Sequence, residues 1–153
     1  MGLDMYLEAR KYTSKDYFSP ELYKKLHEAI DKPEISDFPA IKVSVEVAYW
    51  RKSNQIHKWF VDNVQGGKDD CGEYHVERDQ LITLKTICNA IVKDKNLSQA
   101  VATLPTQSGF FFGNTEYDEY YFSDLEDTAK QLQEVLDNYP DEENWSFVYH
   151  SSW

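Results

Sequence analysis

The sequence contains little cysteine and no long hydrophobic run. It has two cysteines, Cys71 and Cys88, among 153 residues, too few for the disulfide framework of a small secreted domain. No segment approaches the roughly 20 consecutive apolar residues that span a bilayer, and the first residues are already polar at Asp4. These absences predict a cytoplasmic protein with free thiols, without a signal peptide and without a membrane contact.

Positive charge is scarce towards the C-terminus. Residues 1–113 hold 15 basic and 16 acidic residues, whereas residues 114–153 hold one basic residue, Lys130, and 11 acidic ones. Because contacts with nucleic-acid phosphates need Lys and Arg, direct binding of a nucleic-acid backbone is disfavoured. The acidic quarter is most simply a solvated helix that keeps the protein soluble. The alternative is a face that meets a basic host protein, as an inhibitor or nucleic-acid mimic would.

Strand and helix patterns are mixed along the chain. Apolar residues alternate over residues 3–12 and 41–49, and shorter strands are predicted over residues 74–77 and 145–150. Helical periodicity predicts helices over residues 20–31, 51–65, 79–93 and 124–138, with a short one over residues 97–104. The predicted fold is α+β: a single domain over residues 1–153, with a small, mainly antiparallel sheet and about four helices packed on it.

Residues 49–71, YWRKSNQIHKWFVDNVQGGKDDC, concentrate aromatic, cationic and amide side chains. The pattern predicts the end of a strand, one helix and a glycine-rich loop. Wound at about 100° per residue, the helix places His57 within its apolar stripe. A histidine there is most simply a buried structural residue with one hydrogen-bond partner. A catalytic or ligand-binding role is the alternative.

The opposite side of the predicted helix carries binding groups. They are Arg51, Gln55 and Lys58, with Asn54 at the border. A planar guanidinium, an ammonium and two amides suit an anion or a nucleotide. An ordinary solvated face is the alternative, because Arg51, Lys58 and Asp62 have the spacing of helix salt pairs.

The loop after this helix supplies second-tier candidates, Asp69, Asp70 and Cys71. Cys71 or an aspartate could act with His57 in a small hydrolase, since a nucleophile needs a neighbouring base. A zinc site would need a further convergent ligand, for which His75 is the nearest candidate. The pattern falls short of a structural zinc set, so no metal is predicted, and the sequence identifies no cofactor.

Residues 106–121, TQSGFFFGNTEYDEYY, form a second aromatic region. It is predicted to be a strand or an exposed aromatic loop. Phe111, Tyr117 and Tyr120 are candidates to stack on a flat ligand. A subunit interface in a homo-oligomer and complete burial in the core are the alternatives.

Several segments carry a resemblance to other proteins. They are MGLDMYL at residues 1–7, YWRK and NQIHKWF within residues 49–60, DDC at residues 69–71, GFFFG at residues 109–113 and the Tyr117-Asp118 pair. These segments resemble a group of small uncharacterised bacterial and phage proteins. The resemblance implies no activity, but it implies a phage-borne chain, and small phage proteins often disarm host defences by binding an enzyme or sequestering its nucleotide signal.

The density of binding groups and the lack of a complete catalytic set favour a non-enzymatic binding protein. Its predicted ligand is a small, anionic, flat molecule such as a signalling nucleotide. The predicted contacts are Arg51, Asn54, Gln55, Lys58, Phe111, Tyr117 and Tyr120. The hydrolase and the acidic inhibitor remain the alternatives.

Overall fold

The computed structural model describes residues 2–153 as one antiparallel sheet and five α-helices, which confirms the predicted α+β class. The sheet has four strands in the order β2-β1-β4-β3. They are β1 (Asp4–Ser14), β2 (Ala40–Arg51), β3 (Tyr74–Val76) and β4 (Ser146–Ser152). The helices are α1 (Pro20–Ile30), α2 (Asn54–Asn63), α3 (Arg78–Asp94), α4 (Leu97–Thr103) and α5 (Glu119–Asn138), and a 3-10 turn follows at Asp141–Glu143.

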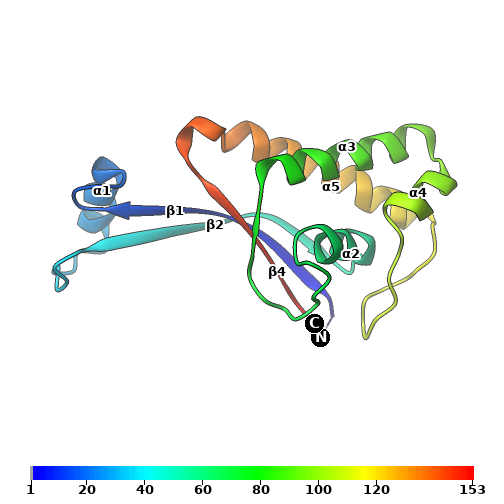
Figure 1. Ribbon diagram of the computed structural model, residues 1–153, viewed down its shortest axis with the longest axis horizontal. Helices are drawn as coiled ribbons and strands as arrows, with labels where there is room; N and C mark the ends of the chain where they lie inside the picture. The colour runs from blue at the N-terminus through cyan, green and yellow to red at the C-terminus, as the bar shows by residue number, and fades with distance from the viewer. Residues whose placement is uncertain (1) are drawn as a thin grey trace.

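The core lies between one face of the sheet and helices α2, α3 and α5. Alternation along β1 sends Met5, Leu7 and Ala9 into it, all fully buried. The long helices α3 and α5 lie side by side over this part of the sheet (Figure 1). The two chain ends lie together at the far end of β1 and β4, where Asp4 pairs with Ser152.

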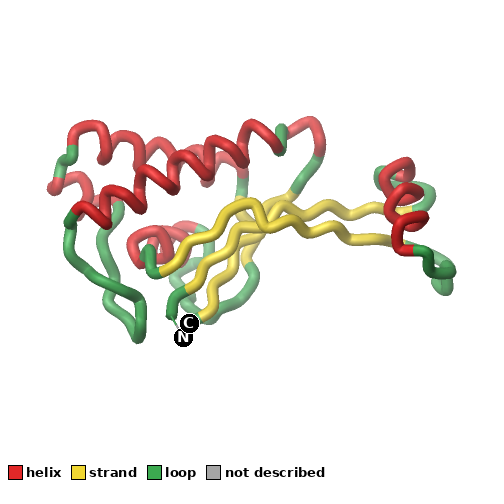
Figure 2. Tube along the Cα trace, turned by 180° about the vertical axis from the view of Figure 1, so that it is seen from behind, coloured by secondary structure: helices red, strands yellow, loops and turns green. Residues whose placement is uncertain are grey.

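The distal half of the β1–β2 ribbon extends beyond the core. β1 pairs with β2 along its whole length, but it pairs with β4 only from Asp4 to Arg10. Past that point two strands continue alone and carry α1 at their end, as Figures 1 and 2 show. A bulge marks the exit: Leu7 pairs with Ala48 and Glu8 pairs with Glu46, which leaves Val47 without an opposite residue. We call residues 11–46 the arm and the rest of residues 2–153 the body.

Several predicted element boundaries were wrong. Arg51 ends β2 and lies outside α2, so it is not on a helix face. α5 begins at Glu119 rather than near Asp124, because the Asp118 side chain accepts hydrogen bonds from the Tyr120 and Tyr121 amides. Residues 104–118 contain no strand, so the aromatic region is a loop.

Both cysteines are free, with Cys71 exposed and Cys88 buried in the core. Burial raises the pKa of the Cys88 thiol to about 12, which keeps it protonated and inert. Within residues 2–153, no helix combines the length and the apolar character needed to cross a bilayer.

Candidate functional site

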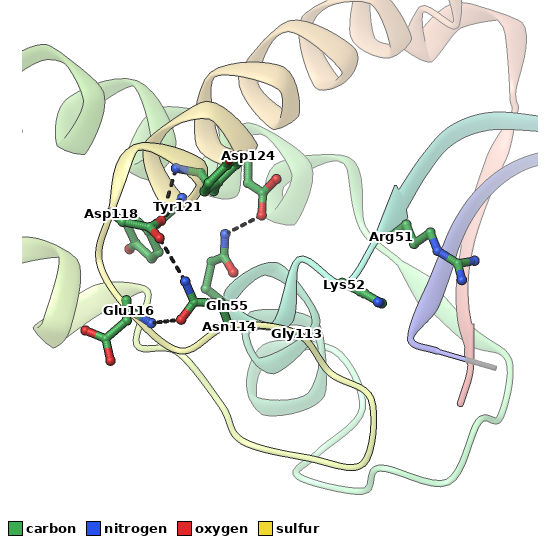
Figure 3. Close-up of a pocket in the computed structure, with 10 residues that line it drawn as sticks. Arg51, Lys52, Gln55, Gly113, Asn114, Glu116, Asp118, Tyr121 and Asp124 are labelled. Atoms are coloured by element: carbon green, nitrogen blue, oxygen red, sulfur yellow. Dashed lines mark hydrogen bonds between the residues drawn. The ribbon is translucent and has the colours of Figure 1, made fainter.

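A hollow of about 270 Å³ lies where β2, α2 and the loop before α5 meet. We call it the junction hollow. It is lined by Arg51, Lys52, Gln55, Gly113, Asn114, Glu116, Asp118, Tyr120, Tyr121 and Asp124. Figure 3 shows cationic side chains on its β2 side and carboxylates on its α5 side. Of the predicted ligand contacts, it brings together Arg51, Gln55 and Tyr120.

Two segments that line the junction hollow, the connection from β2 to α2 and the loop before α5, lie in close contact. Lys52 turns the chain from β2 into α2 with a left-handed backbone, at a φ of 59°. Gly113 of the facing loop has a φ of +94°, and a Cβ added to it would lie 3.0 Å from Lys52 Cβ and 3.1 Å from the Lys52 carbonyl oxygen. Only glycine accommodates both the backbone conformation and the contact.

Asn54 fastens this loop to the start of α2. Its Nδ2 donates to the carbonyls of Phe112 at 3.2 Å and Asn114 at 2.9 Å, and its Oδ1 accepts from the Gln107 amide at 2.9 Å. Asn54, predicted at the border of the polar face and as a ligand contact, is fully buried. Its amide already bonds the protein and positions the loop that borders the hollow.

The α5 side of the hollow is acidic. Asp124 is half-buried and accepts a hydrogen bond from Gln55 Nε2 at 3.1 Å. Burial raises the pKa of Asp124 above its ordinary value, and hydrogen bonds from Gln55 and Ser53 oppose that rise. Asp118 accepts a bond from Asn114 Nδ2 at 2.8 Å besides capping α5. Gln55 is buried and faces Asp124, so the prediction of a solvent-facing Gln55 was wrong.

The β2 side is cationic. Arg51 Nη1 lies 2.8 Å from Asp4 Oδ1, so its charge is largely compensated. The pKa of Asp4 is lowered by the hydrogen bond from the Tyr49 hydroxyl and by the Arg51 charge. Lys52 makes no ion pair with any group of residues 2–153 and is exposed at the hollow. It is therefore the cation best able to meet a ligand, although sequence analysis did not select it.

The predicted stacking residues separate in the structure. Tyr120 lies at the rim of the hollow and is 79% exposed. Tyr117 instead packs against Tyr121 with ring centroids 4.9 Å apart, and its hydroxyl accepts a hydrogen bond from the Thr106 amide. Phe111 is exposed on the loop beside Phe110, outside the residues that line the hollow.

Lys58 also lies outside the hollow. Its ammonium pairs with Asp62 at 2.7 Å, one helical turn along α2. This is the solvated salt pair that its spacing allowed. The four residues predicted to bind from one helix face therefore have four different settings. Arg51 ends β2, Asn54 is buried and bonds the loop, Gln55 bonds Asp124, and Lys58 pairs with Asp62 on the surface.

His57 is fully buried, as its position in the apolar stripe predicted. Its Nδ1 lies 2.7 Å from the Tyr149 hydroxyl and its Nε2 lies 3.0 Å from Asp69 Oδ1. Because an ionised carboxylate oxygen only accepts, Nε2 carries a hydrogen, and in the neutral imidazole Nδ1 then accepts from the Tyr149 hydroxyl. Trp153 Nε1 donates to the same Asp69 oxygen at 3.0 Å, so hydrogen bonds connect Tyr149, His57, Asp69 and Trp153 in series. This network connects α2 to β4 and to the loop that follows α2.

The second-tier residues lie in different surroundings. Asp69 serves the His57 network, and Asp70 accepts hydrogen bonds from the Gly72 amide and the Tyr74 hydroxyl. Cys71 is exposed, whereas His57, the base predicted to act with it, is fully buried. No cluster of three or more potential metal ligands occurs within residues 2–153.

Sequence reasoning missed most of the acidic side of the hollow. The missed lining residues are Lys52, Gly113, Asn114, Glu116, Asp118, Tyr121 and Asp124. The available signal was Asp118 as a capping residue followed by Glu119 in the first turn, which marks a helix start a few residues after Gly113. Comparison of the chain with known protein families, with curated proteins and with solved structures finds no match.

Proposed function

We infer that this is a non-enzymatic binding protein that holds a small, flat ligand with one anionic group in the junction hollow. The carrying observation is the separation of charge across the hollow, with Lys52 and Arg51 on one side and Glu116, Asp118 and Asp124 on the other. An anionic group suits the cationic side. A flat group that carries N–H donors suits the carboxylates, which only accept hydrogen bonds when ionised.

A nucleotide combines both properties in one molecule. Its phosphate would meet Lys52, its base edge would offer N–H groups to Asp124 and Asp118, and Tyr120 at the rim would lie along its face. The hollow of about 270 Å³ suits one such unit rather than a large cofactor. A signalling nucleotide is therefore the ligand class that we favour.

The charge balance limits the number of phosphates. Three carboxylates line the hollow against two cations, and one of the cations is already paired with Asp4. Each added phosphate charge would meet carboxylate repulsion at close range. The arrangement thus favours nucleoside monophosphates and cyclic mononucleotides over triphosphates.

Calorimetric titration against a nucleotide panel tests this proposal. The panel contains monophosphates, cyclic mononucleotides, triphosphates, free nucleosides and inorganic phosphate. We expect one monophosphate or cyclic nucleotide to bind and to raise the melting temperature in a saturable way. Chromatography should recover that nucleotide unchanged, because binding without turnover is the claim.

Matched variants locate the site. Lys52→Gln should weaken binding about ten-fold, the loss of one charge-assisted hydrogen bond. Asp124→Asn should change the preference among bases, since an amide both donates and accepts. Lys58→Gln removes a lysine of α2 that lies outside the hollow and should leave the affinity unchanged. Equal losses in Lys52→Gln and Lys58→Gln, or binding of triphosphates alone, would contradict the proposal.

The hydrolase alternative is less well supported, because His57 is enclosed and both of its ring nitrogens are already bonded. Nucleotide consumed by substoichiometric protein would reverse that preference. The acidic inhibitor depends on the carboxylates of α5 and the following turn. A host protein that co-purifies at low salt and dissociates at high salt would favour it. A cytoplasmic, phage-borne, counter-defence setting remains part of the proposal.

A further inference from the structure

The outer edge of β2 is a surface that the junction hollow does not use. β2 is the outermost strand of the sheet, and no other strand of residues 2–153 pairs with that edge. α5 lies beside the body end of this edge, where Gln131 Oε1 accepts from the Tyr49 amide at 3.1 Å. From Lys42 to Glu46 no side chain of β2 is fully buried. An open edge of this length offers unpaired backbone donors and acceptors to another strand.

The sequence along this edge complements itself about Ser44 when two copies pair antiparallel. Residues 41–47 read Ile-Lys-Val-Ser-Val-Glu-Val. In an antiparallel pair of two identical strands centred on Ser44, Lys42 lies opposite Glu46 of the second strand, and Glu46 lies opposite its Lys42. Val43 lies opposite Val45, and Ile41 lies opposite Val47. Opposite charges directly across a pair stabilise it, and like charges destabilise it.

The charged pairs lie on one face of the sheet and the apolar pairs lie on the other. Lys42, Ser44 and Glu46 share one face, because strand residues alternate, and Ser44 Oγ donates to Glu8 on that same face. The valines share the other face, where Val45 is 36% exposed. Centring the pair on Lys42 or on Glu46 would instead set like charges opposite each other. The Ser44-centred register is the one that matches lysine with glutamate.

We propose that two copies of this chain pair antiparallel through their β2 edges, in register at Ser44, to form a continuous sheet. Two four-stranded sheets then become one of eight strands. The contact is isologous, because each strand offers the same edge to the other about a two-fold axis. A second copy is the occupant because the charge pattern of residues 42–46 complements itself.

The same pairing accounts for the exposed apolar tip of the arm. Antiparallel pairing sends the tip of each arm along the body of the other copy. The tip carries large exposed side chains: Tyr17, Phe18, Ile35 and Phe38. The body offers a hollow beside β2 that is lined in part by Val47, Val135 and Tyr139. The pairing also supports a two-stranded ribbon, which is marginally stable in water by itself.

Sedimentation equilibrium of charge variants tests the register. Wild-type protein should dimerise, and Lys42→Glu or Glu46→Lys alone should raise the dimer dissociation constant about ten-fold or more, because each creates two like-charge pairs. The double variant Lys42→Glu/Glu46→Lys should return it to near the wild-type value. Lys93→Glu makes the same charge change on the exposed surface of α3, outside the arm and β2, and should have no effect.

Three results would overturn the proposal: a monomeric wild type at about 100 µM, single variants whose dimer is no weaker than that of Lys93→Glu, or a double variant whose dimer is not restored. Circular dichroism of each variant confirms that the fold is retained, as expected for exposed positions.

A cysteine placed on the axis gives an independent measurement. In a Cys71→Ser background, Ser44→Cys should form an intermolecular disulfide, because directly opposite residues lie within disulfide range. Lys42→Cys should not, since its copy would lie roughly 13 Å away along the strand. Equal cross-linking of both variants, or of neither, would also overturn the register.

Discussion

The body and the arm of this protein are stabilised by different means. The body has a continuous core of fully buried side chains from the sheet, α2, α3 and α5, including Leu84, Leu125 and Leu132. The arm has one buried aromatic residue, Tyr23, whose hydroxyl donates to Glu34. Lys15 pairs with the same carboxylate at 2.7 Å. The body can thus hold a site rigidly, whereas the arm keeps its apolar tip available for contact.

The largest expected effect on stability comes from comparing a leucine in the body with a leucine in the arm. Leu84→Ala in α3 should lower the free energy of unfolding by about 2–5 kcal/mol, because it empties a fully buried position. Leu26→Ala in α1 removes the same atoms from a partly exposed position and should cost less than about 1.5 kcal/mol. Urea denaturation measures both. Equal losses would show that the arm has a core as well packed as that of the body.

An intermediate effect is expected within the polar interior of the body. Tyr149→Phe removes the hydroxyl that bonds His57 and should cost about 1–3 kcal/mol, because a buried ring nitrogen loses its partner. Tyr120→Phe makes the same change at an exposed ring and should be neutral within about 0.5 kcal/mol. If Tyr149→Phe were as neutral as its control, the His57 network would not stabilise the fold.

The smallest effect concerns Glu8, where the arm leaves the body. Its carboxylate accepts hydrogen bonds from Ser44, Arg10 and His150, led by Ser44, and these lower the pKa of Glu8 from 4.5 to about 2. A lowered folded-state pKa stabilises the fold above the unfolded value, and that stability is lost as the pH falls from about 4.5 towards 2.

Glu8→Gln should therefore cost about 1–2 kcal/mol at pH 7 and almost nothing near pH 2, compared with wild type at each pH. Denaturation curves recorded across this range measure the difference. Glu21→Gln, at an exposed residue of α1, is the control and should show no such convergence. A constant cost at all pH values would mean that shape rather than charge matters at this position.

Patterns of single elements were predictable because they are local. Period-two alternation identified β1 and β2, and the apolar stripe placed His57 inside. The same reasoning failed for Gln55, which it predicted to face solvent. On a helical wheel Gln55 faces away from the apolar stripe, yet the start of α5 folds over that side and buries it against Asp124, which lies 69 residues later. A wheel describes one helix and contains no information about what packs on its polar face.

The sequence by itself determined the α+β class, the strand periodicity and the acidic C-terminal quarter, because these follow from side-chain spacing and composition. Only the tertiary structure decided where Lys52, Gln55 and Asp124 meet, and that β1 and β2 extend beyond β4 to form the arm. The hollow and the arm have the same physical reason. Contacts between residues distant in the chain depend on register, on the bulge at Val47 and on the glycine contact at Gly113, none of which is a property of a single segment.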